Sequence, residues 1–493
     1  MPSHGSTLII PIALLSLVLG YLVINAIYAV TLHPLADVPG PRVCAASRAV
    51  YWYRFMNGRD VRWLYRLHQR YGPVVRFGPS DVSYAAPQAW RDIYGVGKGR
   101  PDMLKPGDAN MRPANDVPSV LIADTENHAR MRKMFSPAFS ERALRRQQGL
   151  FRKYVDTLVA KVNELGSTGE PVEMTSLFNF VTFDIMAELC FGRPLGMLEK
   201  NEFNPWVKAI FGAIKMLPIA NFIQYYPVLD ALFTRFQPQW ITDQRLFFAK
   251  QTEDRVNQRL QEGSQKPDIW NLVLAAQDTD NALSLEEMHS NADLFMMAGS
   301  ETTATLLSGV TYYLLVNPDK MQLLCQEVRT IFDNAEEINL DRLASLKYLN
   351  ACLKEALRVY PPVAIGTARI VPNSGATVLG RWLPAGTRVS CHQYSMYHSP
   401  WNFKNPSQFA PERWLGDPEY ADDVQDAHQP FAYGPRNCLG QNVAMHEMRL
   451  ILASLVWNYD LELCDGNEDW TDQQTFALWI KKPLTCLVRS VAR

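Results

Sequence analysis

One of the eight cysteines, Cys438, lies immediately before an expected helix. It belongs to the run that begins at Phe431 and is close to Gly434, Arg436 and Gly440. The positive end of a helix dipole and its unpaired N–H groups lower the pKa of a nearby thiol and favour the thiolate. Thiolate binds iron, glycine lets the backbone approach a flat ring, and arginine can pair with a carboxylate of that ring. The segment therefore predicts Cys438 as the axial ligand of a haem iron, with Gly434, Arg436 and Gly440 as cofactor contacts.

The alternative is that Cys438 is a small buried hydrophobic side chain, as most intracellular cysteines are. The spacing Phe-x-x-Gly-x-Arg-x-Cys-x-Gly arises by chance in a chain of this length with a probability on the order of 10⁻⁴, which favours the ligand. A thiolate ligand pushes electron density onto iron and favours cleavage of the O–O bond. The predicted chemistry is oxygen activation.

A second group of polar residues lies in a long helix that the capping-box spacing at Ser284 predicts to run as far as Asn317-Pro318. Its middle contains Ala298-Gly299-Ser300-Glu301-Thr302-Thr303, in which a glycine beside hydroxyl residues predicts a local distortion or an inserted water. We expect Thr302 to donate to the distal oxygen and Glu301 to relay protons from solvent. For this segment alone, a structural role in which the threonines only bond to carbonyls one turn earlier is an equally good explanation. The presence of the Cys438 segment favours the role in oxygen chemistry.

Three charged residues suggest a scaffold, the last of them on a loop shortly before the cysteine segment. Glu355 and Arg358 share one helix face, and Arg413 follows in Pro411-Glu412-Arg413. An exposed ion pair at this spacing contributes little, and each residue by itself fits a surface position. If Arg413 meets the other two in the interior, the network fixes the loop that carries the thiolate.

Three further cations are candidates for a haem propionate. His128 and Arg132 are spaced i,i+4, so both can reach one anion from a single helix face. Arg369 lies on an extended segment after Pro361-Pro362. A solvated surface cation is the alternative for each of them.

The N-terminal region is expected to be a membrane anchor. No charged residue lies between Thr7 and Leu32, and the apolar run from Leu8 to Val30 is long enough to span a bilayer. A cleavable signal peptide is less compatible, because the run exceeds the usual h-region of about 7 to 15 residues and lacks a basic n-region. Arg42 and Arg48 follow the run, which places the body of the protein in the cytosol. We expect no second span, and divide the chain into an anchor (1–32), a proline-rich linker (33–48) and a catalytic domain (49–493).

The composition of the chain limits the kinds of molecule that it is expected to bind. The net charge of −1, without a basic stripe, argues against nucleic acid. The eight cysteines are scattered, as in a reduced cytosolic domain. No nucleotide-binding fingerprint is present, so an electron donor must be a separate protein. Helix dominates, with short strands expected at Val74 to Phe77, Val82 to Tyr84, Thr377 to Leu379 and Arg388 to Cys391.

Taken together, the motifs closely resemble the cytochrome P450 superfamily of haem-thiolate monooxygenases, over nearly the whole chain after the anchor. The matching elements occur in the family's order: His128 to Arg132, the 298–303 run, Glu355-x-x-Arg358, Pro411 to Arg413 and the cysteine segment. Two departures are mild, since His128 replaces a common tryptophan and Trp414 a common phenylalanine. The linker and the run Ser119 to Asp124 are similar to microsomal-type filamentous-fungal members.

The resemblance implies a mainly α fold with small β-sheets, a triangular helical domain that encloses haem b, preceded by one transmembrane helix. The implied reaction inserts one oxygen atom from O₂ into an apolar organic substrate, by hydroxylation, epoxidation or multistep oxidation, in fungal secondary metabolism. Electrons from NADPH arrive through a membrane flavoprotein, NADPH-cytochrome reductase, docked on the Cys438 side, with cytochrome b5 as a further candidate partner. The chain is expected in the endoplasmic reticulum membrane, in contact with lipid, with its catalytic domain facing the cytosol.

The same resemblance assigns residues. The proximal ligand falls on Cys438, the oxygen-side pair on Thr302 and Glu301, the buried network on Glu355, Arg358 and Arg413, and the propionate contacts on His128, Arg132, Arg369 and Arg436. It also implies a substrate pocket, for which ordinary core packing is the alternative at each position: Phe295, Met296, Ala298, Ala364, Ile365, Phe476 and Leu478.

Two other functions compete with oxygen insertion. A haem-thiolate isomerase or dehydratase keeps the cysteine ligand but has no dioxygen protons to deliver, so the Glu301-Thr302 pair argues against it. A membrane-tethered haem sensor or electron carrier needs no apolar pocket, and the pocket residues taken jointly argue against it.

Overall fold

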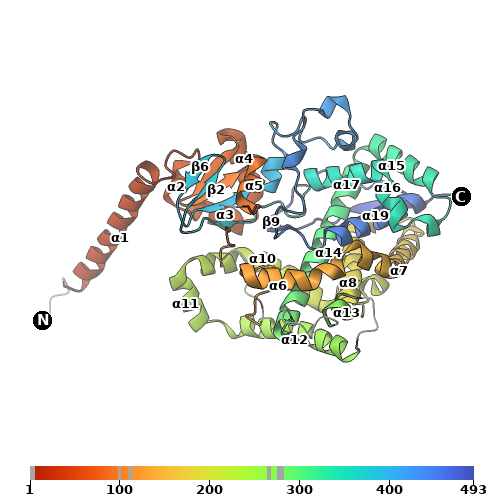
Figure 1. The fold of residues 1–493 in the computed structure, drawn as a ribbon, viewed down its shortest axis with the longest axis horizontal. Coiled ribbons are helices and arrows are strands. Elements are labelled where there is room, and N and C mark those ends of the chain that lie inside the picture. The colour runs from red at the N-terminus through yellow and green to blue at the C-terminus, as the bar shows by residue number, and fades with distance from the viewer. Residues whose placement is uncertain are drawn as a thin grey trace. The chain divides into compact units, whose positions relative to one another are not determined.

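The chain divides into two units, Met1–Pro106 with Ile365–Met396, and Gly107–Ala364 with Tyr397–Arg493. The computed structural model describes residues 6–97, 102–108, 113, 115–263, 268–274 and 282–492. Helices dominate both units, and the strands form small sheets (Figure 1). The mainly α fold with small sheets that the sequence predicts is confirmed.

The smaller unit is built around a four-stranded sheet of order β1-β2-β7-β4, in which β2 and β7 are parallel and the other pairs antiparallel; β5 and β6 form a separate hairpin. The four predicted strands correspond to β1, β2, β5 and β7, each within one residue at either end. The elements of this unit are α1 (Ser6–Thr31), α2 (Arg42–Ala46), α3 (Ala49–Met56), α4 (Asp60–Tyr71), β1 (Val74–Gly78), β2 (Asp81–Tyr84), α5 (Gln88–Tyr94), β4 (Arg369–Ile370), β5 (Ala376–Val378), β6 (Arg381–Leu383) and β7 (Arg388–Cys391), followed by α18 (Gln393–Tyr397).

The proline-rich linker packs against this sheet. Leu35 and Val38 are buried. The buried guanidinium of Arg76 on β1 donates from Nη1 to the carbonyl oxygens of Ala29, at the end of α1, and of Leu35, at 2.8 and 3.0 Å. The end of α1 is thereby attached to the sheet.

The larger unit contains the remaining elements. Its helices are α6 (Thr125–Phe135), α7 (Glu141–Gly166), α8 (Met174–Phe191), α9 (Met197–Lys200), α10 (Pro205–Tyr225), α11 (Pro227–Arg235), α12 (Gln239–Gln261), α13 (Ile269–Leu274), α14 (Leu285–Leu315), α15 (Pro318–Ile331), α16 (Leu340–Ser345), α17 (Lys347–Val359) and α19 (Gln441–Asn458). Short 3₁₀ helices are η1 (Ser136–Phe139), η2 (Ala335–Glu337), η3 (Pro411–Trp414), η4 (Pro418–Tyr420) and η5 (Gln425–Ala427). The strands β3 (Val172–Glu173), β11 (Thr485–Ser490) and β8 (Tyr459–Leu463) form one sheet, and β9 (Thr475–Phe476) pairs with β10 (Leu478–Trp479).

Helix α14 passes through the middle of the larger unit, in contact with α8, α12, α17 and α19 (Figure 1). It begins at the predicted capping box, where Ser284 and Glu287 bond reciprocally, and ends just before Asn317-Pro318. Helix α14 is a continuous α-helix, without the predicted local distortion; the inserted water that was the other possibility stays a prediction. Gly299 serves packing instead: a Cβ there would lie 2.7 Å from Sδ of Met186 on α8, so glycine allows the two helices to approach closely.

Two helices in the described part of the chain, α8 and α10, are long and apolar enough to cross a membrane by length and composition alone. The expectation that the chain has no second span stays a prediction, because length and composition alone do not show that a helix spans a membrane. Burial changes the interpretation of α8, which is buried along nearly its whole length against α14 and α7 and is a core helix of the unit. The apolar part of α1 found among the described residues, Leu19–Thr31, is shorter than the 18 residues required of a candidate span.

Candidate active site

Cys438 lies two residues before Gly440, the N-cap of α19, as the sequence predicts. Its backbone N–H donates to the carbonyl oxygen of Phe431 at 2.8 Å, which closes the loop. Gly434 has a φ of 80°, a left-handed conformation that favours glycine. Gly440 has a φ of −87°, and an added Cβ would meet only Phe139, at 3.9 Å. The protein itself therefore requires glycine at 434 but not at 440.

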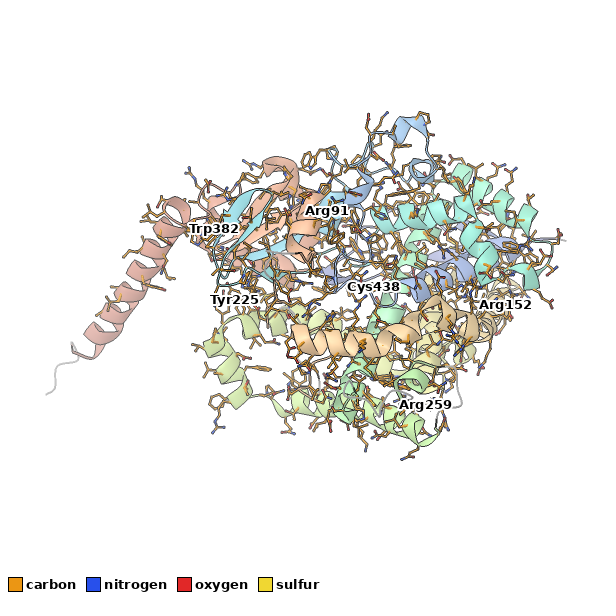
Figure 2. The ribbon with its side chains drawn as sticks, viewed as in Figure 1. Arg91, Arg152, Tyr225, Arg259, Trp382 and Cys438 are labelled. Carbon is orange, nitrogen blue, oxygen red and sulfur yellow. The ribbon has the colours of Figure 1, made fainter. Side chains whose placement is uncertain are left out.

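The Cys438 side chain is exposed, unlike the buried cysteine of the alternative interpretation. Surrounding protein atoms nevertheless desolvate the thiol and raise its pKa, and the Gly440 N–H and the Arg132 charge lower the pKa by less. The expected net lowering by the helix N-terminus is therefore wrong for the protein alone. Cys438 is labelled in Figure 2, and it belongs to the larger unit.

Two of the predicted arginines brace the cysteine loop. Arg132 donates from Nη1 to the carbonyl oxygen of Asn437 at 2.7 Å and from Nη2 to its side-chain oxygen at 2.6 Å. Arg436 donates to the carbonyl oxygen of Ala123 at 2.9 Å. The residue before Cys438 is thus held by α6, a role that the spacing of Arg132 does not reveal.

The other two predicted cations are buried. His128 lies on α6 one turn before Arg132. Arg369 belongs to the smaller unit, where its guanidinium lies 5.0 Å from the ring centroid of Tyr94. Only His128, Arg132 and Arg436 therefore share the unit of Cys438.

One face of α14 is accessible although most of that helix is buried. Ala298 is exposed, and Leu294 and Thr302, one turn before and after it, are half-buried. Because residues four apart lie on the same helix face, the three form a strip, which we call the α14 strip. Leu294 was missed by the sequence analysis. An accessible face in the middle of a core helix is the surface that a bound group would cover.

The hydroxyls on α14 bond to the helix itself. Thr302 donates to the carbonyl oxygen of Ala298 at 2.7 Å, and Thr303 to that of Gly299 at 2.9 Å. These are the hydrogen bonds expected if the threonines have only a structural role in the helix. Thr302 nevertheless belongs to the α14 strip, whereas Thr303 is buried, so only the Thr302 hydroxyl oxygen is open to accept another donor.

Glu301 does not face solvent. Its side chain is 3% exposed and forms an ion pair through Oε1 with Lys481, whose side chain is 4% exposed. Burial raises the pKa of Glu301, and Lys481 lowers it in part. The second oxygen, Oε2, is buried without a hydrogen-bond partner among the described residues. A proton from solvent can therefore reach Glu301 only through another group, and Lys481 is a contact that the sequence analysis missed.

The predicted pocket residues separate into two groups. Phe295 and Met296 are buried, and Phe295 packs edge-to-face against Phe135 and Phe139; their place in a pocket stays a prediction. Met296 lies on another face of α14 than the strip, whereas Phe295, seven residues before Thr302, borders the strip. Ala364 and Phe476 are also buried, Ala298 and Leu478 are accessible, and Ile365 belongs to the smaller unit.

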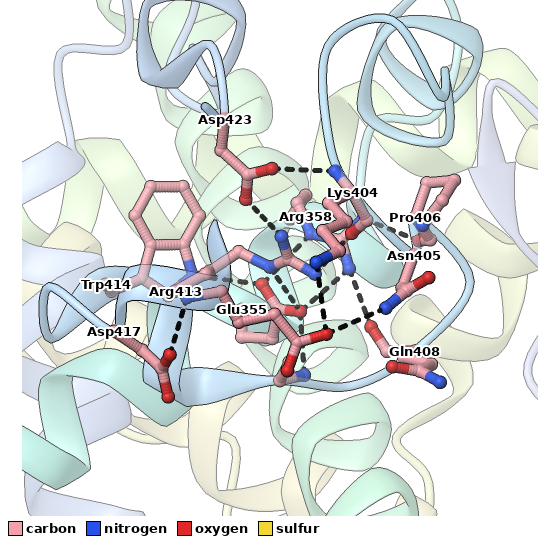
Figure 3. A network of polar contacts seen from close by, with 12 residues as sticks. Glu355, Arg358, Lys404, Asn405, Pro406, Gln408, Arg413, Trp414, Asp417 and Asp423 are labelled. Atoms are coloured by element: carbon pink, nitrogen blue, oxygen red, sulfur yellow. Dashed lines mark hydrogen bonds and ion pairs between the residues drawn. The ribbon is translucent and has the colours of Figure 1, made fainter. Parts of the chain in front are cut away.

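The three predicted network residues meet in the interior (Figure 3). The buried Glu355 carboxylate accepts hydrogen bonds from Nε and Nη2 of Arg358 at 2.9 and 2.7 Å, and from Nε of Arg413 at 3.0 Å. The Ala410 N–H and the Trp414 indole N–H also donate to it, each at 2.9 Å. Burial by itself raises the pKa of Glu355, but the guanidiniums and the Ala410 N–H outweigh it and hold the pKa below its usual value.

Two members of this network were not foreseen. Asp423 pairs with Arg413, with both side chains nearly fully buried, and the second oxygen of Asp423 accepts from the Lys404 N–H at 2.7 Å. The cluster therefore balances two guanidiniums with two carboxylates. Trp414, noted in the sequence only as a replacement for phenylalanine, contributes a hydrogen bond that phenylalanine lacks.

The helical fold presents an accessible thiol before α19 and an accessible strip on α14, which packs against α19. This arrangement is typical of a protein that holds a prosthetic group at a cysteine. The family model described as Cytochrome P450 matches residues 49–488. The chain belongs to the cytochrome P450 family.

Curated relatives agree with this assignment. "Cytochrome P450 monooxygenase efuB" of Hormonema carpetanum is 42% identical over 479 residues, which cover 96% of this chain and 95% of the relative. "Cytochrome P450 monooxygenase FUM2" of Gibberella moniliformis is 44% identical over 93% of this chain and 98% of its own length. "Averantin hydroxylase" of Dothistroma septosporum is 40% identical over 93% and 87%. The chain is thus a monooxygenase of a family that uses haem b and a separate reductase.

The residues present fit haem. The Cys438 thiol is accessible, its loop is braced by Arg132 and Arg436, and the α14 strip presents small and apolar side chains with one hydroxyl. These are the donor and the uncovered protein surface that a thiolate-bound ring needs.

Replacement of Trp414 by phenylalanine tests the network. Trp414→Phe removes one hydrogen bond to a buried carboxylate, so we expect the free energy of unfolding to fall by about 1.5 to 3 kcal/mol. Without the indole N–H the pKa of Glu355 should be less depressed. The stability that the ionised carboxylate contributes is lost as pH falls from the unfolded pKa to the folded one, so in the variant this loss should be smaller and complete at a higher pH. Urea unfolding followed by circular dichroism measures both effects.

The matched control is Trp401→Phe, since Trp401 is 44% exposed. It should leave the urea midpoint unchanged. Equal shifts in the two variants would contradict the role of the Trp414 indole N–H.

Proposed function

We propose that this chain inserts one oxygen atom from O₂ into an apolar organic substrate, with Cys438 as the axial ligand of haem b. The observation that carries the proposal is the accessible thiol of Cys438 at the start of α19, in the same unit as the α14 strip. Haem bound there supplies the reductive activation of dioxygen, with the second oxygen atom leaving as water. The names of the relatives, monooxygenases and a hydroxylase, support the reaction class.

The protein's own part in this reaction is positioning and proton supply. Arg132 fixes the residue before Cys438 through two hydrogen bonds, so the sulfur keeps one position. The Thr302 hydroxyl lies on the accessible strip and can accept a proton donor while it donates to Ala298, or turn from Ala298 and donate. His128, Arg132, Arg369 and Arg436 are the proposed propionate contacts. Gly434 gives the loop its turn, and Gly440 leaves the surface beside Cys438 bare.

The substrate is proposed to be apolar because the strip and the hairpin tip offer few charges. Leu294 and Ala298 on α14, with Phe476 and Leu478 on β9 and β10, are proposed contacts. The other pocket residues that the sequence predicts are proposed as well: Phe295, Met296, Ala364 and Ile365. The fungal sources of the relatives support a place in fungal secondary metabolism.

Electrons are proposed to come from NADPH through NADPH-cytochrome reductase, with cytochrome b5 as a second donor. The docking face is the Cys438 side of the larger unit, where Pro435 and the first residues of α19, Gln441 and Asn442, are exposed. Docking there keeps the path to the sulfur short.

We further propose that residues 1–32 anchor the chain in the endoplasmic reticulum membrane as a single span, with residues 33–48 as linker and 49–493 as the cytosolic catalytic domain. Helix α1 has 26 residues, a length of about 39 Å at 1.5 Å per residue, enough for a hydrocarbon core of about 30 Å. Leu17, Tyr21 and Ile24 on it are exposed.

Replacement of Cys438 by alanine tests the ligand. Cys438→Ala should abolish the thiolate-type red-shifted band of the reduced carbon monoxide complex, because sulfur no longer binds iron. Cys464→Ala, at a half-buried cysteine elsewhere in the larger unit, is the control and should keep the band. A band that persists in Cys438→Ala would require another ligand, and a wild-type chain that binds no haem would refute the proposal as a whole.

Replacement of Thr302 by alanine tests oxygen insertion. Reductant should still be consumed, while product per reductant falls by about tenfold or more and peroxide rises, because the proton donor at the accessible strip is lost. Thr303→Ala, at the buried neighbour, should leave the ratio near wild type. An unchanged product yield in Thr302→Ala would remove this residue from the mechanism, and turnover without oxygen uptake would favour an isomerase or dehydratase.

Removal of residues 1–32 tests the anchor. The full chain should stay in the microsomal pellet after alkaline carbonate extraction, whereas a variant that begins at residue 33 should be released, because a spanning helix is lost. Both should show the same carbon monoxide spectrum. Release of the full chain by carbonate would rule out a spanning anchor.

A further inference from the structure

Two adjacent lysines near the C-terminus have opposite environments. The side chain of Lys482 reaches the Asp469 carbonyl oxygen at 2.8 Å from an exposed position. The side chain of Lys481 is 4% exposed, forms the ion pair with Glu301, and donates to the Thr305 hydroxyl at 3.1 Å. A buried ammonium is costly unless it is paired and hydrogen-bonded. The buried Lys481 ammonium is paired in this way, and it connects two elements of the fold, the β9–β10 hairpin and α14.

The first of these elements is the hairpin formed by β9 and β10. Phe476 pairs with Leu478 across Ala477, which has a φ of 67°, so these two side chains flank the hairpin tip. The Ile480 N–H donates to the Gln474 carbonyl oxygen at 2.9 Å and closes the base. Lys481 follows directly, so its side chain attaches the base of the hairpin.

The other side of the same hairpin is fixed to the end of α17. The Trp479 indole N–H donates to the Pro361 carbonyl oxygen at 2.8 Å, and the Trp479 ring stacks on Tyr360 with centroids 4.9 Å apart. The Tyr360 hydroxyl donates to the Gln473 side chain at 2.5 Å. The lysine adds an attachment to α14, and its ion pair lies beside the strip.

The second element is α14. Glu301 and Thr305 are one turn apart on the face that meets Lys481, and Thr302 of the accessible strip is the neighbour of Glu301 in sequence. The hairpin is thus tied to the helix one residue from the proposed site of oxygen chemistry. Strand β9 also contacts α10, so the hairpin is in contact with a second helix of the same unit.

We propose that Lys481 is a positioning residue that fixes the β9–β10 hairpin against α14 through Glu301, and so determines where Phe476 and Leu478 stand as a wall of the substrate pocket. The inference rests on the proposed function of this site and adds a determinant of substrate selectivity. It also gives Glu301 a structural task, since Oε1 is committed to the lysine and only Oε2 remains open.

The test compares Lys481→Met with the matched control Lys482→Met in the haem-loaded full chain. Hydrogen exchange of the peptide that covers residues 471–482 should become at least about threefold faster in Lys481→Met, because the hairpin opens locally. Binding of 4-phenylimidazole, a probe with an iron-binding nitrogen and an apolar ring, should change in Kd by about 3- to 30-fold, measured by optical difference titration. Lys482→Met should match wild type in both measurements.

Two further variants keep the test decisive if Lys481→Met folds poorly because a buried carboxylate is left unpaired. The double variant Glu301→Gln with Lys481→Met removes both charges, which proteins often tolerate, and should show the same fast exchange. Lys481→Arg keeps the charge and should restore slow exchange.

Wild-type exchange and wild-type Kd in Lys481→Met or in the double variant would overturn the proposal. So would a rise in peroxide with unchanged exchange and Kd, which would make Lys481 a group that only tunes proton supply. The wild-type carbon monoxide band distinguishes this failure from failure of the proposed function, because the band reports haem-thiolate ligation whatever Lys481 does.

Discussion

The buried carboxylate of Glu355 is the interaction on which the cysteine side of the larger unit depends. It joins α17 to the segment after residue 409 through two guanidiniums, one backbone N–H and one indole. Arg358 also donates to the carbonyl oxygens of Tyr397, Pro406 and Gln408, so a chain segment with little regular structure is held by charge. An ion cluster of this kind is costly to desolvate, and its value lies in fixing one arrangement of a loop that apolar packing leaves undefined.

Helix α14 serves a different task on each face. One face packs closely on α8, where Gly299 admits Met186; a second binds Lys481 through Glu301; a third, the α14 strip, is left uncovered by protein. Because a helix presents a new direction every residue, positions within one turn can serve packing, attachment and chemistry. The continuous hydrogen bonding of α14 makes it a rigid support for all three.

The electrostatics of the cysteine loop show a balance that differs from the simple helix-dipole argument. Crowding by protein raises the pKa of the Cys438 thiol more than the Gly440 N–H and Arg132 lower it. A thiol that the protein alone does not ionise is consistent with one whose proton is displaced only on metal binding. The braces at Asn437 and Ala123 then matter for position rather than for acidity.

The sequence by itself determined the family, the mainly helical class, the four short strands and the limits of α14, because local spacing, caps and turn residues act over a few positions. It also supplied candidates for the haem contacts, which stay predictions. Only the tertiary structure decided which face each residue occupies. Phe295 and Met296 went to the core and Leu294 to the strip, although all lie within three positions. Asp423, Trp414 and Lys481 joined buried charges from distant segments. Such partners are chosen by desolvation and packing across the fold, and no spacing along the chain records them.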